Sequence, residues 1–356
     1  MTKNKKTISL LRASKGRGFV EPRYSPFIQK FVSIVGPLYL KKVEGVKSVK
    51  IENIDFLFDA LKEHYNKERT LIIAFRHVEK QDAPVLTYVL NTALTKRIKN
   101  YNKTVEKEKR IIGHAQFLYG SDVLEWAGSL AAFIFPRLGG IPVINRSNNS
   151  KALNLLKTTM KAGLFPVALA PESQVTYHMA RVFETSSGIS SLAVWAEEGG
   201  KEVTILPIAF GYNYDKDAEI FINSCIKRWR EETAIDVADN ISLYEKLIFI
   251  TQETIKILES FYSIEENIDY SLKERIDHIC HISMNTGEHI AHVRGSGSLL
   301  DRLFSIRHAG ISALKPDDFE RDKKSSINSS IADFTALHAH IFLWHSQIVD
   351  VLEYID

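Results

Sequence analysis

A histidine and an aspartate five positions apart are the residues of this chain whose types and spacing suggest catalysis most directly. His77 follows the apolar run 70–75, which predicts a buried strand, and Asp82 precedes Pro84, a residue common in the first turn of a helix. Such a loop can fold back so that the carboxylate holds one imidazole nitrogen and leaves the other as a general base. The same spacing also fits a simple helix cap at Asp82 and an ordinary loop histidine at His77.

The chemistry of such a base depends on which proton it removes. The sequence places no obvious enzyme nucleophile beside His77, so the natural proton to remove is that of a substrate hydroxyl. We therefore expect direct attack of an alcohol on an acyl donor, without an acyl-enzyme.

Three later apolar runs also predict buried strands that end near polar residues: 141–145, 165–170 and 203–208. The first follows two glycines and is followed by Arg146, at the strand end where open α/β sheets bind ligands. A guanidinium there suits a phosphate, because it donates two charge-assisted hydrogen bonds, although an exposed arginine that merely ends a strand has the same pattern. The second run leads into Glu172 and Ser173, and the third contains a proline, which is typical of an edge strand or an interruption near a site.

The elements that must position these residues alternate along residues 70–224, where helix-length amphipathic segments separate the short apolar runs. The expected strands are 70–75, 110–113, 141–145, 165–170, 203–210 and 219–223, and the expected helices are 84–95, 122–137, 149–162 and 188–198. Helical periodicity continues at 242–262, 271–294, 296–313 and 327–354. The sequence therefore predicts an amphipathic N-terminal segment (1–42), an α/β domain (43–230) and an all-helical C-terminal domain (231–356).

The composition excludes several classes of protein. With 45% hydrophobic and 25% charged residues, the chain is neither mainly disordered nor fibrous. The 46 basic against 43 acidic residues give a net charge of +3, so we expect no nucleic-acid partner. Two cysteines exclude a disulfide-stapled scaffold. No apolar run reaches the roughly 20 residues of a membrane span, and the basic start does not continue as a secretory signal, so we expect a cytoplasmic protein.

The apolar stretch 26–40 is long enough to lie in a membrane interface. Its apolar residues recur near helical spacing: Phe27, Ile28, Phe31, Ile34, Val35 and Leu38. Lys30, Lys41 and Lys42 suit anionic headgroups, so we expect peripheral membrane association. Pro37 is expected to break or kink the helix. A second apolar stretch, 124–135, is more typical of a core helix than of a membrane contact.

These residues together resemble the glycerolipid acyltransferases, the superfamily that includes lysophosphatidic acid and glycerol-3-phosphate acyltransferases. His77 and Asp82 match its H-x4-D motif. Residues 140–146 resemble the second block, a glycine and an apolar strand that ends in arginine, and residues 203–208 resemble the fourth, an apolar strand with a proline. Glu172, after a proline, falls where the third block reads F-P-E-G-T-R. The resemblance covers about residues 41–210 and implies a mixed, mostly parallel sheet covered by helices.

The resemblance implies an O-acyltransferase that moves a fatty acyl group from acyl-CoA or acyl-carrier protein to a hydroxyl of a glycerol-based lysophospholipid, most simply 1-acylglycerol-3-phosphate. In that reaction His77 would be the general base and Asp82 would orient it. Arg146, Glu172 and Ser173 would hold the acceptor and its phosphate, with Arg76 as a further cation. The family needs no metal or cofactor besides the acyl thioester.

The chain departs from the family pattern at three positions. Glu79 stands where a small hydroxyl residue is common, Ser173 replaces a glycine, and Val175 replaces the second arginine of the third block. Arg76 or Arg181 can substitute for that cation, or the acceptor lacks a phosphate at that place. A glycerol-3-phosphate acyltransferase and an acyltransferase for a non-phosphate acceptor therefore remain alternatives.

Two further interpretations concern the C-terminal region. Asp277, His281, Glu288 and His292 share one helical face and, with His338 and His345, suggest a metal site in a helical bundle. The spacing argues against it, because di-iron proteins use Glu-x-x-His. A non-enzymatic alternative is a helical partner-binding module, one that docks carrier protein for example. The apolar stripe for it, Leu299, Leu300, Leu303, Phe304 and Ile306, is more typical of a core than of an interface.

Overall fold

The computed structural model of the chain describes residues 19–120, 123–143, 150–179, 182, 185–214, 218–265 and 270–313. Their contacts divide the chain after Tyr212 into a unit that spans Arg17–Tyr212 and a second unit that begins at Asn213. Each unit is described by itself below. The sequence predicts the boundary at residue 230, whereas the contacts place it between Tyr212 and Asn213.

The first unit is built on a five-stranded sheet with strand order β3-β2-β4-β1-β5. The strands are β1 (Arg69–Phe75), β2 (Gln116–Gly120), β3 (Ile141–Val143), β4 (Val167–Leu169) and β5 (Glu202–Ile208). Every pairing among them is parallel, whereas the resemblance implied a mixed, mostly parallel sheet. The expected α/β class is confirmed. Because parallel strands point the same way, the carboxyl ends of β1 and β4 lie at one edge of the sheet.

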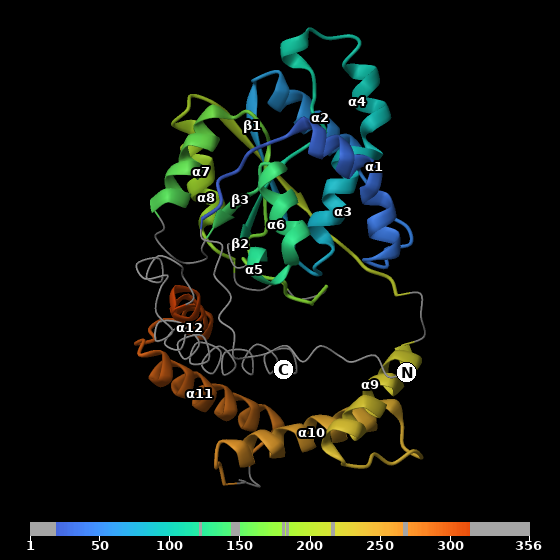
Figure 1. Cartoon of the computed structure of the whole chain (residues 1–356), viewed down its shortest axis with the longest axis vertical. Helices are drawn as coiled ribbons and strands as arrows, with labels where there is room; N and C mark the ends of the chain where they lie inside the picture. The colour runs from blue at the N-terminus through green and yellow to red at the C-terminus, as the bar shows by residue number, and fades with distance from the viewer. Residues whose placement is uncertain are drawn as a thin grey trace, which may run out of the picture. The chain divides into compact units, whose positions relative to one another are not determined.

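Helices cover both faces of this sheet (Figure 1). Those of the first unit are α1 (Pro26–Lys42), α2 (Ile54–Tyr65), α3 (Asp82–Tyr88), α4 (Thr95–Tyr101), α5 (Val123–Trp126), α6 (Gly128–Arg137), α7 (Ser150–Ala162) and α8 (Gly188–Glu197). A π-helical turn (Val89–Ala93) joins α3 to α4, and a short 3-10 turn (Lys107–Lys109) precedes β2. The expected helices 149–162 and 188–198 are confirmed, while the expected helix 122–137 is divided at Gly128, whose φ is +87°.

The alternation of side chains along β1 explains the two cores of this unit. Leu71, Ile73 and Phe75 belong to a cluster with residues of α2 and α3, whereas Ile72 belongs to a cluster with residues of α7 and α8. Successive strand residues point to opposite faces, so a central strand that is covered on both sides reads as a continuous apolar run. This is why the run that precedes His77 was recognisable as a strand.

Two expected strands are wrong. Residues 110–113 do not join the sheet, because the backbone N–H of Ile111 donates to the side chain of Asn102 at 2.9 Å, and the strand begins later, at Gln116. Residues 219–223 lie in α9 (Ala218–Thr233). A run of three consecutive apolar residues between two polar ones also fits the start of an amphipathic helix, so the short run misled the sequence interpretation. The proline-containing strand was expected to be an edge strand or to be interrupted near a site, and β5 is an edge strand of the sheet.

Pro37 was expected to break or kink the helix, and α1 runs through it without a break. A proline inside a helix leaves the carbonyl four residues earlier without its usual donor. In this helix that carbonyl belongs to Ser33, and the hydroxyl of Thr92 donates to it at 3.3 Å. Gln29 fixes the inner face of α1 further, since its side-chain amide donates to Asn91 at 2.9 Å. The neighbouring chain thus replaces the hydrogen bond that proline removes.

The second unit is helical in its described residues, with α9, α10 (Leu243–Phe261), α11 (Leu272–Ala291) and α12 (Leu299–Ala313). Ser242 and Ser271 each form a capping box, an arrangement that the Ser-x-x-Glu sequence predicts. The apolar stripe of α12 packs as a core, since Leu303 and Ile306 are fully buried. The expected helix 327–354 lies outside the described residues. Within the described part of the chain, no helix is both long and apolar enough for a membrane span.

Candidate active site

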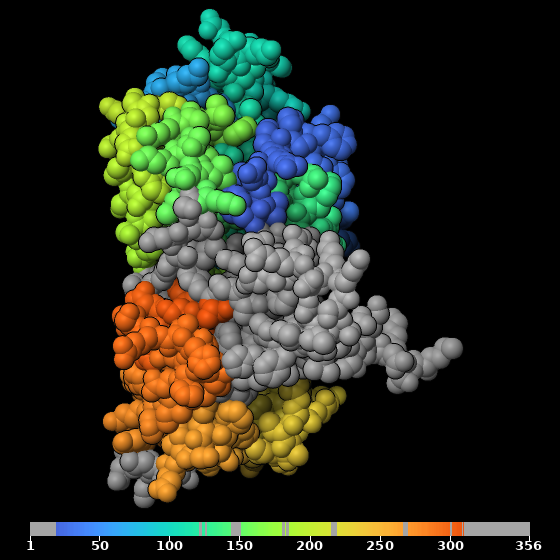
Figure 2. Space-filling view, turned by 60° about the vertical axis from the view of Figure 1, so that its left-hand side comes forward, coloured from blue at the N-terminus to red at the C-terminus, as the bar shows by residue number. Residues whose placement is uncertain are grey.

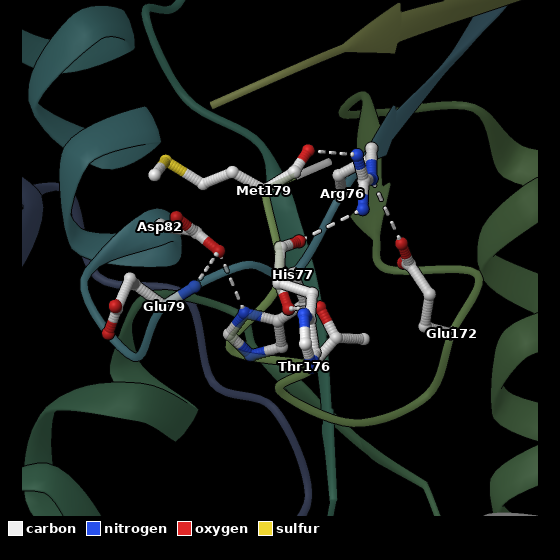
Figure 3. A network of polar contacts seen from close by, with 8 residues as sticks. Arg76, His77, Glu79, Asp82, Glu172, Thr176 and Met179 are labelled. Carbon is white, nitrogen blue, oxygen red and sulfur yellow. Dashed lines mark hydrogen bonds and ion pairs between the residues drawn. The ribbon is translucent and has the colours of Figure 1, made fainter. Parts of the chain in front are cut away.

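His77 and Asp82 meet at the carboxyl end of β1 (Figure 3). Nδ1 of His77 lies 3.1 Å from Oδ2 of Asp82, and the backbone N–H of Glu79 donates to the same oxygen at 2.8 Å. Asp82 is the first residue of α3, and its side chain is fully buried, while 23% of the His77 side chain is exposed. A carboxylate only accepts hydrogen bonds, so Nδ1 carries the proton and Nε2 is the basic nitrogen of the neutral ring.

A third donor to this carboxylate comes from a distant part of the chain. The hydroxyl of Tyr212 donates to Oδ1 of Asp82, across 130 positions of sequence. Buried carboxylates need such donors, because an unpaired charge is costly away from water. The sequence analysis missed Tyr212, because a tyrosine just beyond a strand carries no periodic or motif signal that would tie it to Asp82.

The loop after β4 is hydrogen-bonded to the side chain of Arg76 and to the backbone carbonyl of His77. Thr176 donates twice to the carbonyl of His77, from its backbone N–H at 2.7 Å and from its hydroxyl at 3.1 Å. The guanidinium of Arg76 donates to the carbonyls of Met179 at 2.9 Å and His178 at 3.1 Å. These four bonds hold the loop against the histidine (Figure 3). Thr176 was also missed by the sequence analysis.

Glu172 and Ser173 lie at the start of this loop, as the strand prediction implied. The carboxylate of Glu172 is almost completely buried and lies 3.5 Å from Nε of Arg76. Its Oε2 receives no hydrogen bond from the described residues. Ser173 has a φ of +62°, a conformation that favours glycine, which is the residue that the resembling family has at this place. The hydroxyl of Ser173 lies 3.4 Å from that of Ser186.

The glycine turn before β3 is closely packed. A Cβ added to Gly140 would lie 2.9 Å from the carbonyl oxygen of Phe135 and 3.0 Å from the ring of Tyr119. Nε2 of His114 lies 2.7 Å from the carbonyl oxygen of Leu138, the residue before the turn. The close contacts around Gly140 explain on steric grounds why this position, in the stretch that resembles the family's second block, is a glycine. Arg146 and Arg181, the cations expected to bind the acceptor, lie outside the described residues.

Two histidines of this unit are buried away from the pair. Burial lowers the pKa of His114 to about 4, and burial together with the positive charge of Lys201 lowers the pKa of His64 to about 4. His64 accepts a hydrogen bond at Nδ1 from the backbone N–H of Leu71, 3.2 Å away. Both imidazoles therefore belong to the packing of the α/β unit.

One of the C-terminal residues considered for a metal, Glu288, is held in an ion pair with Arg302. Glu288 accepts two hydrogen bonds from Arg302, at 2.7 and 2.8 Å. Within the described residues, no three histidine, cysteine, aspartate or glutamate side chains gather closely enough for a metal ion. His338 and His345 lie outside those residues.

Comparisons of the chain with protein families, curated proteins and solved structures find no match. The structure brings together His77, Asp82, Arg76, Glu172 and Ser173 at one edge of the sheet.

Proposed function

We propose that the protein is an O-acyltransferase that moves a fatty acyl group from acyl-CoA or acyl-carrier protein to a hydroxyl of a glycerol-based lysophospholipid, with 1-acylglycerol-3-phosphate as the preferred acceptor. The observation that carries the proposal is the contact of 3.1 Å between Nδ1 of His77 and the buried carboxylate of Asp82. This contact leaves Nε2 as a base at a sheet edge where α/β folds bind ligands. The order of motifs along the sequence supplies the substrate class.

The reaction uses His77 twice. Nε2 takes the proton of the acceptor hydroxyl while the oxygen attacks the thioester carbonyl, so that the new C–O bond forms. The C–S bond then breaks, and the thiolate leaves with the proton that His77 holds, as a free thiol. Asp82 stabilises the imidazolium between the two steps, since it faces Nδ1 with a charge that water does not screen.

The acceptor is proposed to lie against the loop after β4. Glu172 is a proposed contact of a hydroxyl of the glycerol backbone, because a carboxylate accepts hydrogen bonds; its Oε2 receives none from the described residues, but it is closed off from solvent, so the loop has to open for that contact to form. Ser173, Arg76 and Arg146 are the proposed contacts of the phosphate. Because the Nη atoms of Arg76 already donate to two carbonyls, Arg146 is the cation on which phosphate recognition mainly depends in this proposal.

Acyl transfer assayed with a panel of lysolipids and both thioester types, and read by mass spectrometry, tests the proposal. His77→Ala and Asp82→Asn should each lower the rate, and the loss for His77→Ala should be at least about 100-fold, because a general base contributes roughly 10²- to 10⁴-fold. His281→Ala is the matched control, since His281 is an exposed histidine of the helical unit. Undiminished rates in folded His77→Ala protein would remove the mechanism.

We also propose that α1 rests on a membrane surface, in a cytoplasmic protein that associates peripherally. Its most exposed apolar side chains are Phe27 (77% exposed), Ile34 (68%) and Leu38 (59%). At about 100° per residue they share one stripe of the helix. Lys30 and Lys41 lie on one side of the stripe and Lys42 on the other, and these lysines suit anionic headgroups. The blue N-terminal part of this unit lies at the surface in Figure 2.

Helix α6 also carries exposed apolar side chains. Leu130 is 64% exposed and Phe133 is 47% exposed, although the sequence interpretation favoured a core for this stretch. The segment before α1 is bound to the end of α6, because Ser25 N–H donates to the carbonyl of Arg137 at 2.8 Å. Helices α1 and α6, which are linked through this hydrogen bond, thus both expose apolar side chains.

Flotation with vesicles of phosphatidylcholine, with and without phosphatidylglycerol, tests this surface. The double variant Ile34→Glu with Leu38→Glu should float less, because it places charges where the chain would enter the lipid. Ile220→Glu with Phe221→Glu is the matched control, since both residues are similarly exposed on α9. Equal flotation of the α1 variant and the unmodified protein would exclude this face as the contact.

A further inference from the structure

We propose that Tyr212 is a positioning residue for His77 and acts on it through Asp82. The carboxylate of Asp82 divides its two oxygens between different partners. His77 and the backbone N–H of Glu79 contact Oδ2, and the hydroxyl of Tyr212 donates to Oδ1. The inference rests on the proposed function for its catalytic consequence, while the effect on the imidazole itself is measurable without any substrate.

The donor on Oδ1 fixes how the carboxylate is turned. The terminal torsion of an aspartate side chain is broad, so one hydrogen-bonded oxygen does not determine the plane of the group. Donors on both oxygens of Asp82 restrict that rotation and keep a lone pair of Oδ2 directed at Nδ1 of His77. A fixed acceptor at Nδ1 selects one tautomer of the neutral ring, the one with its free lone pair on Nε2.

Tyr212 is placed by the same elements that build the rest of the site. The chain leaves β5 at Ile208, whose carbonyl accepts the backbone N–H of Arg76 at 3.0 Å. The backbone N–H of Tyr212 then lies 3.1 Å from the sulfur of Met179, in the loop that Arg76 holds. Tyr212 lies beyond the end of β5 and takes no part in the pairing of β5 with β1, so its hydroxyl can be removed without breaking that pairing.

The hydroxyl also tunes the base. Hydrogen bonds to a carboxylate stabilise its charged form, and they weaken the hold of that carboxylate on the proton of the imidazolium. Without the hydroxyl, Asp82 would stabilise the protonated ring more strongly, and the acid limb of a rate–pH profile would move to higher pH. The other charged groups around the pair, Arg76, Glu79 and Glu172, are unchanged by a substitution at position 212.

The closing experiment compares Tyr212→Phe with the unmodified protein by ¹⁵N NMR of the histidine side chains at alkaline pH. The unmodified protein should hold His77 in the Nδ1–H tautomer, and Tyr212→Phe should shift it toward a mixture. Tyr119→Phe is the matched control, because the buried Tyr119 hydroxyl makes no hydrogen bond within the described residues. An unchanged His77 signal in folded Tyr212→Phe protein overturns the inference.

The rate–pH profile gives a second readout. Tyr212→Phe should lower the transfer rate by about tenfold, less than His77→Ala, and should move the acid limb up by about half a pH unit, a roughly threefold change in proton affinity. If Tyr212→Phe does not fold, 3-fluorotyrosine at position 212 keeps the ring and makes its hydroxyl a stronger hydrogen-bond donor. The acid limb of the rate–pH profile should then move to lower pH. An acid limb at the same pH as in the unmodified protein also overturns the inference. A shifted tautomer in a protein without acyl transfer would instead refute the proposed function alone.

Discussion

The buried imidazole of His114 makes a quantitative prediction about acid stability. Its pKa falls from 6.5 to about 4 because of burial, so the folded protein binds its proton less readily than the unfolded chain does. Above pH 6.5 the imidazole of His114 is neutral in both the folded and the unfolded state, so its titration does not change the free energy of unfolding. As the pH falls from 6.5 to 4, the unfolded state gains a proton that the folded state lacks, and the free energy of unfolding decreases.

The size of this decrease in the free energy of unfolding follows from the difference between the two pKa values of His114. At about 1.4 kcal/mol per pH unit, the fall from 6.5 to about 4 corresponds to about 3 kcal/mol for His114 alone. The exchange of His114→Gln keeps a donor for the carbonyl of Leu138 and removes the titration. The variant should therefore lose about 3 kcal/mol less than the unmodified protein between pH 7 and pH 4.

Amide hydrogen exchange of the slowest amides in β1 and β4 measures this, because it reports the opening of the α/β unit alone. His64, whose pKa is also lowered to about 4, is present in both proteins, so its contribution cancels in the comparison. The same dependence of exchange on pH in both proteins would refute the reasoning, whatever the stability of either at neutral pH.

Three further substitutions test local features of the structure. Ser173→Gly should stabilise the α/β unit by about 0.5 kcal/mol, because the relief of backbone strain at a φ of +62° exceeds the entropy that glycine adds to the unfolded chain. A lower free energy of unfolding for this variant in urea would contradict the prediction. Gly140→Ala should destabilise the α/β unit by about 1–3 kcal/mol, since the new methyl group meets a backbone oxygen at 2.9 Å, whereas Gly211→Ala, where nothing lies within 4 Å of the added atom, should change the stability by less than about 0.5 kcal/mol; equal effects would show that the turn has room. Arg302→Met should cost the helical unit about 2 kcal/mol by leaving the Glu288 carboxylate without its two charged donors, and a thermal midpoint equal to that of the unmodified protein would show that the pair contributes nothing.

The parts of the fold that the sequence predicts are those with strong local signals. The run before His77 is apolar throughout because β1 is covered on both faces, and Ser242 and Ser271 carry the Ser-x-x-Glu signature of a capped helix. The wrong strands, 110–113 and 219–223, are both short. At four or five residues an apolar run does not distinguish a strand from an extended loop or the first turns of a helix.

The residues of the candidate site also divide into those with a local sequence signal and those without one. His77 and Asp82 were predictable because the loop between a strand and a helix is short, so two residues five apart can meet. Tyr212 and Thr176 contact the same groups from 130 and 99 positions away, and no local pattern encodes such pairings. Only the register of β1 with β4 and β5 brings them to His77 and Asp82.

The attachment of the β4 loop to His77 has a consequence for how the protein is made. The segment that carries His77 leaves the ribosome first, whereas the groups that hold its carbonyl and its carboxylate partner follow about a hundred residues later, at Thr176 and Tyr212. Contacts so far apart in sequence form late, after the loops between them have closed. A nascent chain therefore carries the imidazole of His77 before the residues that bind its carbonyl and the carboxylate of Asp82 have been made.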